Sequence, residues 1–384
     1  MKNRLSSGPL LRISSHIIKV TLIVLTVIVS LTFLLGAYSG YIRPSKWIIP
    51  ALLGLFFPVL LVLQMGVTIL WLLAFDRKRL LMLCAVWLIS LPQLLIYFPI
   101  NRSERVSDEH SEPTIRVLSY NVCAFGFKPH SDVAPNATLQ YIKSSGADIV
   151  CIQEAMLNQN PFAGVVSKTL KGYLSQDYPH IRVIRVNRGG STLAILSKHP
   201  ISSVREIPIP SWVNGAIAAK ILVHDKEILV INAHLESYHL GRVDGVDGEE
   251  YLNLVKEGNA IRLQDALRAK LSPTLKAHEE QAEILHNFIQ EHSKEGRVIV
   301  CGDFNDTPLS YLHRRVSEGM EDAFVERGNG FGFTFHTRPF YVRIDHIIYG
   351  KAFRALSCQV DRSAAESDHY PIEAVLALAP SPAE

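Results

Sequence analysis

Three long runs of uncharged, mostly apolar residues occupy the first hundred residues, and they limit what this part of the chain can fold into. The runs are Val20–Ala37, Trp47–Phe75 and Leu80–Ile100. A helix of about 20 apolar residues spans the roughly 30 Å hydrocarbon core of a bilayer. A cleaved signal peptide is the alternative for the first run, but two further runs behind it favour a permanent anchor. We therefore expect residues 1–100 to form a membrane anchor with three transmembrane helices.

The basic residues that flank these runs predict an orientation in the membrane. Four of them, at positions 2, 4, 12 and 19, precede the first run, and three more lie at 77–79. The loop between the first two runs contains only Arg43 and Lys46. Basic loops face the cytoplasm. We therefore expect a multi-pass protein of the bacterial inner (plasma) membrane, with everything after Ile100 in the periplasm.

The rest of the chain differs from the anchor in charge. Residues 1–100 hold nine Lys or Arg and one acid, a net charge of +8. The totals of 39 basic and 36 acidic residues leave 30 and 35 for residues 101–384, a net charge of −5. This part therefore lacks the bulk basic charge that is typical of nonspecific nucleic-acid binders.

The five cysteines do not predict a disulfide framework. None stands in a CxxC or zinc-binding spacing. Cys123, Cys151 and Cys301 lie in or beside apolar strand patterns, so we expect them to be small buried hydrophobic residues. Unpaired cysteines are unusual in a domain outside the cytoplasm.

Residues 115–384 have the pattern of an α/β domain, after a polar linker at 101–114. A helix is expected over 139–145, closed by Gly146. Residues 237–293 form a long, mostly helical insertion with a glycine-rich acidic start, which is either a lid over the substrate or a solvated surface excursion. The expected strands are 115–122, 147–154, 180–186, 191–197, 216–223, 226–233, the apolar start of VIVCGDFN at 298–301, 344–349 and 372–378.

The stretch VIVCGDFN, Val298–Asn305, is the most informative segment of this domain. Its apolar run predicts a strand buried on both faces, after which Gly302 lets the chain turn sharply. Asp303 and Asn305 then emerge at the carboxyl end of the strand, where α/β sheets bind ligands. A carboxylate beside a carboxamide suits a site that orients water against a phosphate held on a divalent ion. The alternative is a turn with local hydrogen bonds.

Other polar residues also stand at the ends of predicted strands. They are Asn121, Glu154, His234, Asp345 and the pair Asp368–His369. Each alone has a simple explanation as a turn residue or a solvated strand end. Acids, amides and imidazoles gathered at strand ends are, however, typical of metal-assisted hydrolysis sites.

In this order, the motifs SYN, IQE, NAHLES, GDFND, RIDHI and SDHYP resemble those of the endonuclease/exonuclease/phosphatase superfamily, the deoxyribonuclease I-like enzymes. The resemblance extends from Ile115 to about Leu378. It implies a four-layer α/β sandwich, in which two mixed β-sheets are flanked by helices. It also implies hydrolysis of phosphoric esters with Mg²⁺ or Mn²⁺ as cofactor.

The resemblance implies which residues bind metal and substrate. Glu154 matches the main metal ligand of the family, and Asp368 lies beside the metal. Asn121 matches the amide that assists near both metal and phosphate. Arg188, before two glycines, is either a phosphate contact or an ordinary turn arginine.

The resemblance also implies a catalytic set. Asp303 would orient or deprotonate the attacking water, and Asn305 would donate to the developing oxyanion. His369 would hold a phosphoryl oxygen while Asp345 fixes its tautomer. His234 matches a second histidine of the deoxyribonuclease and sphingomyelinase branches.

Three functions remain open for this membrane-bound domain. The first is a nuclease or phosphodiesterase that acts on nucleic acid or nucleotides, which most of the resemblance favours. The second is a phosphodiesterase of phospholipid or sphingolipid head groups, which the anchor favours. The third is a non-catalytic, membrane-tethered binding module, which the full motif set disfavours.

Overall fold

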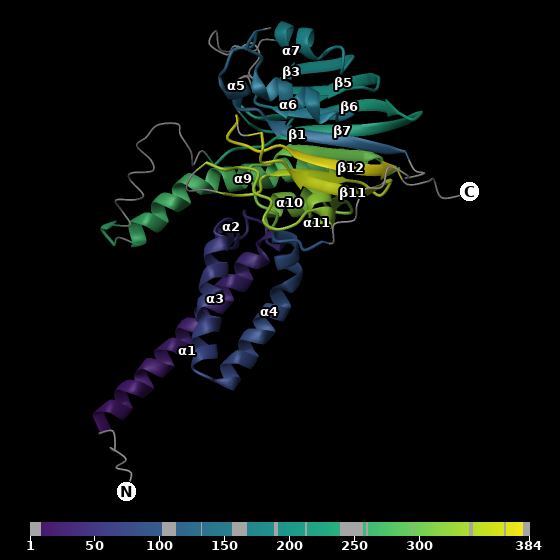
Figure 1. The fold of residues 1–384 in the computed structure, drawn as a ribbon. Helices are drawn as coiled ribbons and strands as arrows, with labels where there is room; N and C mark the ends of the chain where they lie inside the picture. Colours follow the sequence, from purple (N-terminus) through teal and green to yellow (C-terminus); the bar gives the residue numbers. More distant parts are fainter. Residues whose placement is uncertain are drawn as a thin grey trace, which may run out of the picture.

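The computed structural model describes most of the 384-residue chain. The described residues are 9–101, 113–131, 133–155, 167–187, 191–211, 213–238, 256–258, 260–293, 295–337, 341–364 and 366–378. They form a group of N-terminal helices and an α/β domain that lies against one end of those helices (Figure 1). We call the helices the N-terminal bundle. It consists of α1 (Pro9–Ala37), η1 (Ser39–Tyr41), α2 (Ile48–Leu55), α3 (Phe57–Leu73) and α4 (Arg77–Tyr97).

The N-terminal bundle contains two helices that are long and apolar enough to cross a membrane, His16–Ala37 and Arg77–Tyr97. The expected second run is not one helix, because α2 and α3 meet at a bend of 77°. Pro58 lies in the first turn of α3 and has no N–H to donate to the carbonyl of Gly54, so α2 ends there. The bundle has three candidate spans if the bent pair is counted as one.

The helices of the bundle lie side by side, with the start of α1 and the α3–α4 turn at the end away from the α/β domain (Figure 1). A few interior polar groups join them. Ser30 Oγ donates to Gln64 Oε1 at 3.2 Å, and Trp71 Nε1 donates to Thr26 Oγ1 at 2.8 Å. Polar side chains of this kind bond to one another where apolar surroundings offer no water.

Two six-stranded mixed sheets form the centre of the α/β domain. The first has the order β11-β12-β1-β2-β4-β3 and the second β5-β6-β7-β8-β10-β9. The pairs β1–β2 and β7–β8 are parallel, and the other neighbours are antiparallel. The strands are β1 (Thr114–Asn121), β2 (Ile149–Gln153), β3 (His180–Arg185), β4 (Thr192–Ser197), β5 (Ile201–Ile207), β6 (Gly215–Val223), β7 (Lys226–His234), β8 (Val298–Asp303), β9 (Glu321–Asp322), β10 (Asp345–Tyr349), β11 (Phe353–Val360) and β12 (Ile372–Leu378).

Helices cover the outer face of each sheet, which confirms the expected four-layer sandwich. Apolar residues of α6 (Ala137–Ser145) and α7 (Ser167–Leu174) pack on the first sheet. Those of α9 (Ala260–His292) and α10 (Tyr311–Val316) pack on the second. The remaining helices are short: α5 (Cys123–Gly126), a single left-handed turn, and α11 (Ala323–Arg327).

The core between the two sheets is built from the alternate residues of strands such as β1, β2, β8 and β10. Cys151 of β2 and Cys301 of β8 face each other there, and both are fully buried. These two cysteines are the small buried residues that the sequence predicts. Cys123 is only partly buried, because it lies in the left-handed turn after β1 rather than in a strand.

The nine expected strands are present, whereas β5, β9 and β11 have no counterpart among them. All three are edge strands, and β5 buries only its first and last residues. The expected helix at 139–145 is α6, which begins after the N-cap Asn136 and ends at Gly146 with φ of 64°. In the insertion, α9 is described, whereas 239–255 lie outside the described residues.

Candidate active site

The topology brings the polar residues at the strand ends to one edge of the two sheets. Asn121 ends β1, His234 ends β7 and Asp303 ends β8. Glu154 directly follows β2. Parallel neighbours place these ends together, and antiparallel β10 starts beside Asp303, where Asp345 is its register partner.

Asp303 lies at the centre of this group. Its Oδ2 accepts a hydrogen bond from Asn121 Nδ2 at 3.0 Å and lies 3.7 Å from the Nε2 atoms of both His234 and His369. Burial raises the pKa of Asp303 to about 6, and the nearby carboxylate of Asp345 acts in the same direction. A carboxylate with a pKa in this range is suited to accept a proton near neutral pH.

His369 and Asp345 form a buried ion pair. Nδ1 of His369 lies 2.8 Å from Asp345 Oδ2. Burial lowers the pKa of His369, but the carboxylates of Asp345 and Asp303 outweigh it and raise that pKa to about 10. The ring is therefore a cation at neutral pH, with Nε2 directed toward Asp303.

Glu154 contacts residues from both sheets. Its Oε1 accepts from Asn121 Nδ2 at 3.1 Å and lies 3.7 Å from His234 Nε2. Burial raises the pKa of Glu154, and the charge of Asp368 contributes to the increase. Since the carboxylates of Glu154 and Asp368 repel one another, a bound cation would relieve the repulsion.

His234 is fully enclosed by the site. Burial lowers the pKa of His234, against the opposing effect of Asp303. Its Nδ1 is buried and makes no hydrogen bond within the part of the chain that the structure describes. Burial therefore favours the neutral imidazole of His234, unlike His369.

Asn305 is beside the group, but its side chain is already engaged. Nδ2 of Asn305 donates to Leu235 O at 2.9 Å, and its backbone N donates to Asp303 Oδ1 at 2.8 Å. Its φ of 53° is unusual for a residue other than glycine. The hydrogen bond from the Asn305 backbone N fixes the rotamer of Asp303, a role that was not expected for Asn305 from the sequence.

Gly302 is needed for a reason other than the expected sharp turn. Strand β8 continues through Gly302 to Asp303. The φ of Gly302 is 144°, and a Cβ atom there would lie 1.8 Å from the carbonyl oxygen of Ala233 in β7. Glycine therefore allows β7 and β8 to approach closely just before their last residues, His234 and Asp303.

The donor chemistry of the site fits a hard divalent cation. Glu154 and Asp368 offer carboxylate oxygens, which Mg²⁺ and Mn²⁺ prefer. Asn121 turns its Nδ2 toward Glu154 and Asp303, while its Oδ1 accepts from the backbone N of Cys123 at 3.1 Å. Separately, one ligand atom each from Asp303, Asp345 and His369 lie within 4.8 Å of one another. Oδ1 of Asp345 is buried without a hydrogen-bond partner among the described residues, so the site retains unused acceptor capacity.

Three positioning residues were not singled out from the sequence. Gln153 Nε2 donates to Asn232 Oδ1 at 2.7 Å and so links the two sheets below the site. Thr334 Oγ1 accepts from the backbone N of Asp345 at 3.1 Å. Each of the two linked amides lies within a motif, Gln153 in IQE and Asn232 in NAHLES, which was the available signal. Thr334 stands in no motif. Arg188, for which the sequence leaves open a phosphate contact or an ordinary turn, lies outside the described residues.

Comparisons with known families match both parts of the chain. The sequence profile of the Endonuclease/Exonuclease/phosphatase family matches residues 118–369, and that of a Domain of unknown function (DUF8431) matches residues 19–97. No curated protein sequence gives a significant match.

Solved structures with similar folds have low sequence identity to this chain. An endonuclease/exonuclease/phosphatase from Beutenbergia cavernae is 17% identical with a TM-score of 0.50, over 71% of this chain and 73% of that one. One from Bacteroides vulgatus is 19% identical with a TM-score of 0.47, over 70% and 100%. The mannosyl-6-phosphatase Bt3783 of Bacteroides thetaiotaomicron is 18% identical with a TM-score of 0.44, over 69% and 100%. The first of these supports the fold.

Proposed function

The chain belongs to the endonuclease/exonuclease/phosphatase family, whose members are hydrolases of phosphoester bonds, and from this premise we propose that it is a membrane-anchored, divalent-metal-dependent phosphoric-ester hydrolase. In this proposal residues 1–100 are the anchor, 101–114 a linker and 115–384 the catalytic domain, with an insertion at 237–293. The observation that carries the proposal is the buried group in which Asp303 contacts Asn121 and lies 3.7 Å from two histidines.

The group supplies the parts that phosphate-ester hydrolysis requires. We assign Asp303 as the base that orients or deprotonates the attacking water, since burial raises its pKa to about 6. His369, protonated through Asp345, donates to a phosphoryl oxygen, and neutral His234 donates or accepts beside it. Donors aimed at the oxygens where charge develops stabilise the transition state.

Glu154 is assigned as the main metal ligand, with Asn121 and Asp368 completing the protein's share of the site. A bound Mg²⁺ or Mn²⁺ would neutralise charge on the phosphoryl oxygens. The protein's own part is to hold Glu154 in place. Its backbone φ is 52°, and its carbonyl oxygen accepts from the backbone N of Ala124 at 2.9 Å. Asn305, with its amide bound to Leu235 O, supports the loop and offers its second N–H to the substrate.

We propose that the substrate is nucleic acid or a nucleotide, so that the enzyme is a nuclease or phosphodiesterase. The support is the motif set around Asn121, Glu154 and His234, which most resembles nucleic-acid enzymes. A lipid head-group phosphodiesterase is the second candidate. One observation favours it: the N-terminal bundle packs directly on the α/β domain, which would keep the site near a bilayer surface (Figure 1).

We also propose that the catalytic domain lies outside the cytoplasm. The start of α1 and the α3–α4 turn lie at the end of the bundle away from the domain (Figure 1). Arg12, Lys19 and the basic residues 77–79 belong to these two segments, and such segments face the cytoplasm. A secreted-phosphatase reporter fused after Arg105 should be active in a bacterial host, and a fluorescent protein that matures only in the cytoplasm should stay dark. An inactive phosphatase reporter and a fluorescent cytoplasmic reporter would show the opposite orientation.

A turnover screen tests the activity. The full-length protein in nanodiscs with Mg²⁺ is given DNA, RNA, nucleotides, phospholipids, sphingomyelin and phosphomonoesters, with the His369→Ala variant as the matched control. We expect release of product from at least one phosphate ester, abolished by a chelator and strongly reduced in the variant. No turnover of any ester by the wild-type protein, or equal turnover by the variant, would contradict the proposal.

A further inference from the structure

The N-terminal bundle and the α/β domain share a hydrophobic core. Leu309, in the loop that follows β8, is only 2% exposed. Its side chain belongs to the apolar cluster of the bundle, together with Phe33, Phe57 and Tyr97. A residue of the catalytic domain is therefore inserted among the helices, so the two parts are packed together rather than merely joined by a linker.

The backbones of the two parts also approach closely at Leu309. Ser39 Oγ donates to the carbonyl oxygen of Leu309 at 2.9 Å. A Cβ atom on Gly40 would lie 2.8 Å from that same oxygen and 2.9 Å from the carbonyl oxygen of Ser310. Only glycine permits this spacing without a shift of backbone atoms.

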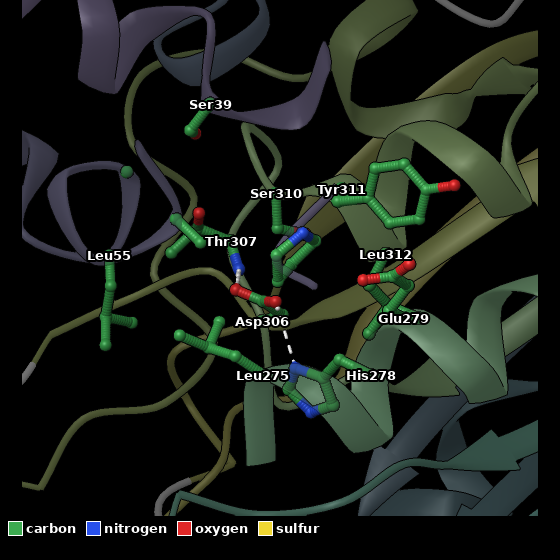
Figure 2. A pocket seen from close by; sticks show the side chains of 13 residues that line it. Ser39, Leu55, Leu275, His278, Glu279, Asp306, Thr307, Ser310, Tyr311 and Leu312 are labelled. Atoms are coloured by element: carbon green, nitrogen blue, oxygen red, sulfur yellow. Dashed lines mark hydrogen bonds and ion pairs between the residues drawn. The ribbon is translucent and has the colours of Figure 1, made fainter. Parts of the chain in front are cut away.

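The loop that Leu309 belongs to begins at the candidate base. Residues 303–310 run from Asp303 and Asn305 in the site to Leu309 and Ser310 at the bundle. In its middle, Asp306 Oδ2 lies 3.0 Å from His278 Nδ1 of α9, and its Oδ1 accepts from the backbone N of Thr307. Figure 2 shows these side chains with Ser39 and Leu55 of the bundle around a cavity of about 10 Å³, room for one water molecule. The loop therefore has fixed contacts along its length.

A second catalytic segment also contacts the bundle. Arg343 stands two residues before Asp345 and is 3% exposed. Its Nη2 donates to the carbonyl oxygen of Ile96, in the last turn of α4, at 2.6 Å. Its guanidinium carbon lies 4.5 Å from the centre of the Phe324 ring. A cation at a helix C-terminus, where carbonyls lack partners, is a stabilising contact.

We propose that the N-terminal bundle is a positioning element of the active site: through Leu309 and Arg343 it sets the places of the two segments that carry Asp303 and Asp345. The inference deepens the proposed function, on which it rests for its catalytic readout. Ser39 and Gly40 are then positioning residues, which act through the loop and touch no substrate. In this proposal the bundle raises the rate of hydrolysis as well as fixing the catalytic domain at the membrane.

Two glycines of the same bundle give a matched test. Gly40→Ala requires Leu309 to move by about 0.6 Å, from 2.8 Å to the 3.4 Å at which ordinary contact begins. Gly66→Ala in α3 is the control, since a Cβ there meets nothing within 4 Å. A misplacement of 1 Å can cost about 100-fold in rate, so we expect kcat for bis(p-nitrophenyl) phosphate to fall about tenfold in Gly40→Ala, with KM nearly unchanged. Gly66→Ala should match the wild type.

Hydrogen exchange of the full-length protein in nanodiscs gives a readout that does not need activity. The amides of residues 303–310 should exchange faster in Gly40→Ala than in Gly66→Ala, while those of β2 and β4 stay the same. Equal exchange in 303–310, with equal kcat where turnover is present, would overturn the inference. If the wild-type protein hydrolyses no ester, the proposed function fails and exchange alone decides. If β2 and β4 also exchange faster in Gly40→Ala, the domain has lost its fold, and Ser39→Ala, which removes one hydrogen bond, decides by the same criteria.

Discussion

Gly302→Ala should be among the most damaging single substitutions in the α/β domain. The new Cβ atom would lie 1.8 Å from the carbonyl oxygen of Ala233, which is backbone and cannot rotate away. Strands β7 and β8 would have to separate where Leu235 N now donates to Asp303 O at 2.9 Å. A φ of 144° adds strain for any residue with a Cβ.

The size of the effect follows from these contacts. Backbone strain costs about 1–3 kcal/mol. The loss of one or two buried backbone hydrogen bonds adds about 1–3 kcal/mol, for a total of about 4 kcal/mol. Since 1 kcal/mol shifts the melting temperature of a domain of this size by about 2–4 °C, we expect a decrease of roughly 8–16 °C.

Gly146→Ala is the matched control for this prediction. Gly146 also has a positive φ, 64°, but a Cβ there would meet nothing within 4 Å. Gly146→Ala should cost only about 1 kcal/mol of stability, because the backbone strain comes without a steric clash. Both variants are made in the full-length protein and melted in detergent, with circular dichroism of the strands as the signal. If Gly302→Ala melts within 3 °C of Gly146→Ala, on the order of 1 kcal/mol, the close approach of β7 and β8 is not as tight as described.

Three further predictions follow from the site and its surroundings. Glu154→Gln should weaken Mg²⁺ binding, measured by titration calorimetry, without lowering the melting temperature; unchanged affinity would remove Glu154 as the main ligand. His369→Ala and Asp303→Asn should each reduce kcat by at least about tenfold, or 1.4 kcal/mol of barrier, and smaller losses would place catalysis elsewhere. Asp322, whose Oδ2 lies 2.8 Å from His313 Nε2, gives a pH prediction. Burial raises the pKa of Asp322, but the hydrogen bonds of two histidines outweigh it and hold that pKa well below its usual 3.8. The ionised group therefore stabilises the fold above about pH 4, and this contribution is lost as the pH falls further. Urea unfolding should show Asp322→Asn to be about 3 kcal/mol less stable than wild type at pH 7, with the difference shrinking in acid; a constant difference would contradict the assignment.

Much of the α/β domain could be predicted because its central strands are buried on both faces. Every residue of β8 is buried, as its unbroken apolar run requires. Edge strands such as β5 bury only part of their side chains, so their sequences carry no clear period. The bend at Phe56 was missed because apolar composition alone does not reveal where a helix is interrupted, although Pro58 was the available signal.

The candidate site was predictable as a set of residues but not as a geometry. Asn121, Glu154, His234, Asp303 and Asp345 stand at strand ends in the sequence, and the topology brings them together. What the sequence does not reveal is which polar atoms are already engaged, as for the Asn305 amide bound to Leu235 O.

The contact between the bundle and the domain was also not predictable. Leu309 is an isolated apolar residue in a polar loop, and such residues are common on protein surfaces. Its burial depends on helices more than two hundred residues earlier in the chain, which no local pattern can indicate. Arg343 likewise has the pattern of an ordinary charged residue, and only the structure places it on the last turn of α4.

The facing thiols of Cys151 and Cys301 have a consequence for the order of events when the protein is made. Burial raises the pKa of Cys151 well above its usual value, so almost no thiolate is present to react with an oxidant once the sheets have packed. Before that packing, both thiols belong to an extended chain and are open to disulfide exchange. In an oxidising compartment, rapid packing of the sheets therefore protects Cys151 and Cys301. A slowly folding variant would accumulate disulfides at these two cysteines that the packed sheets prevent.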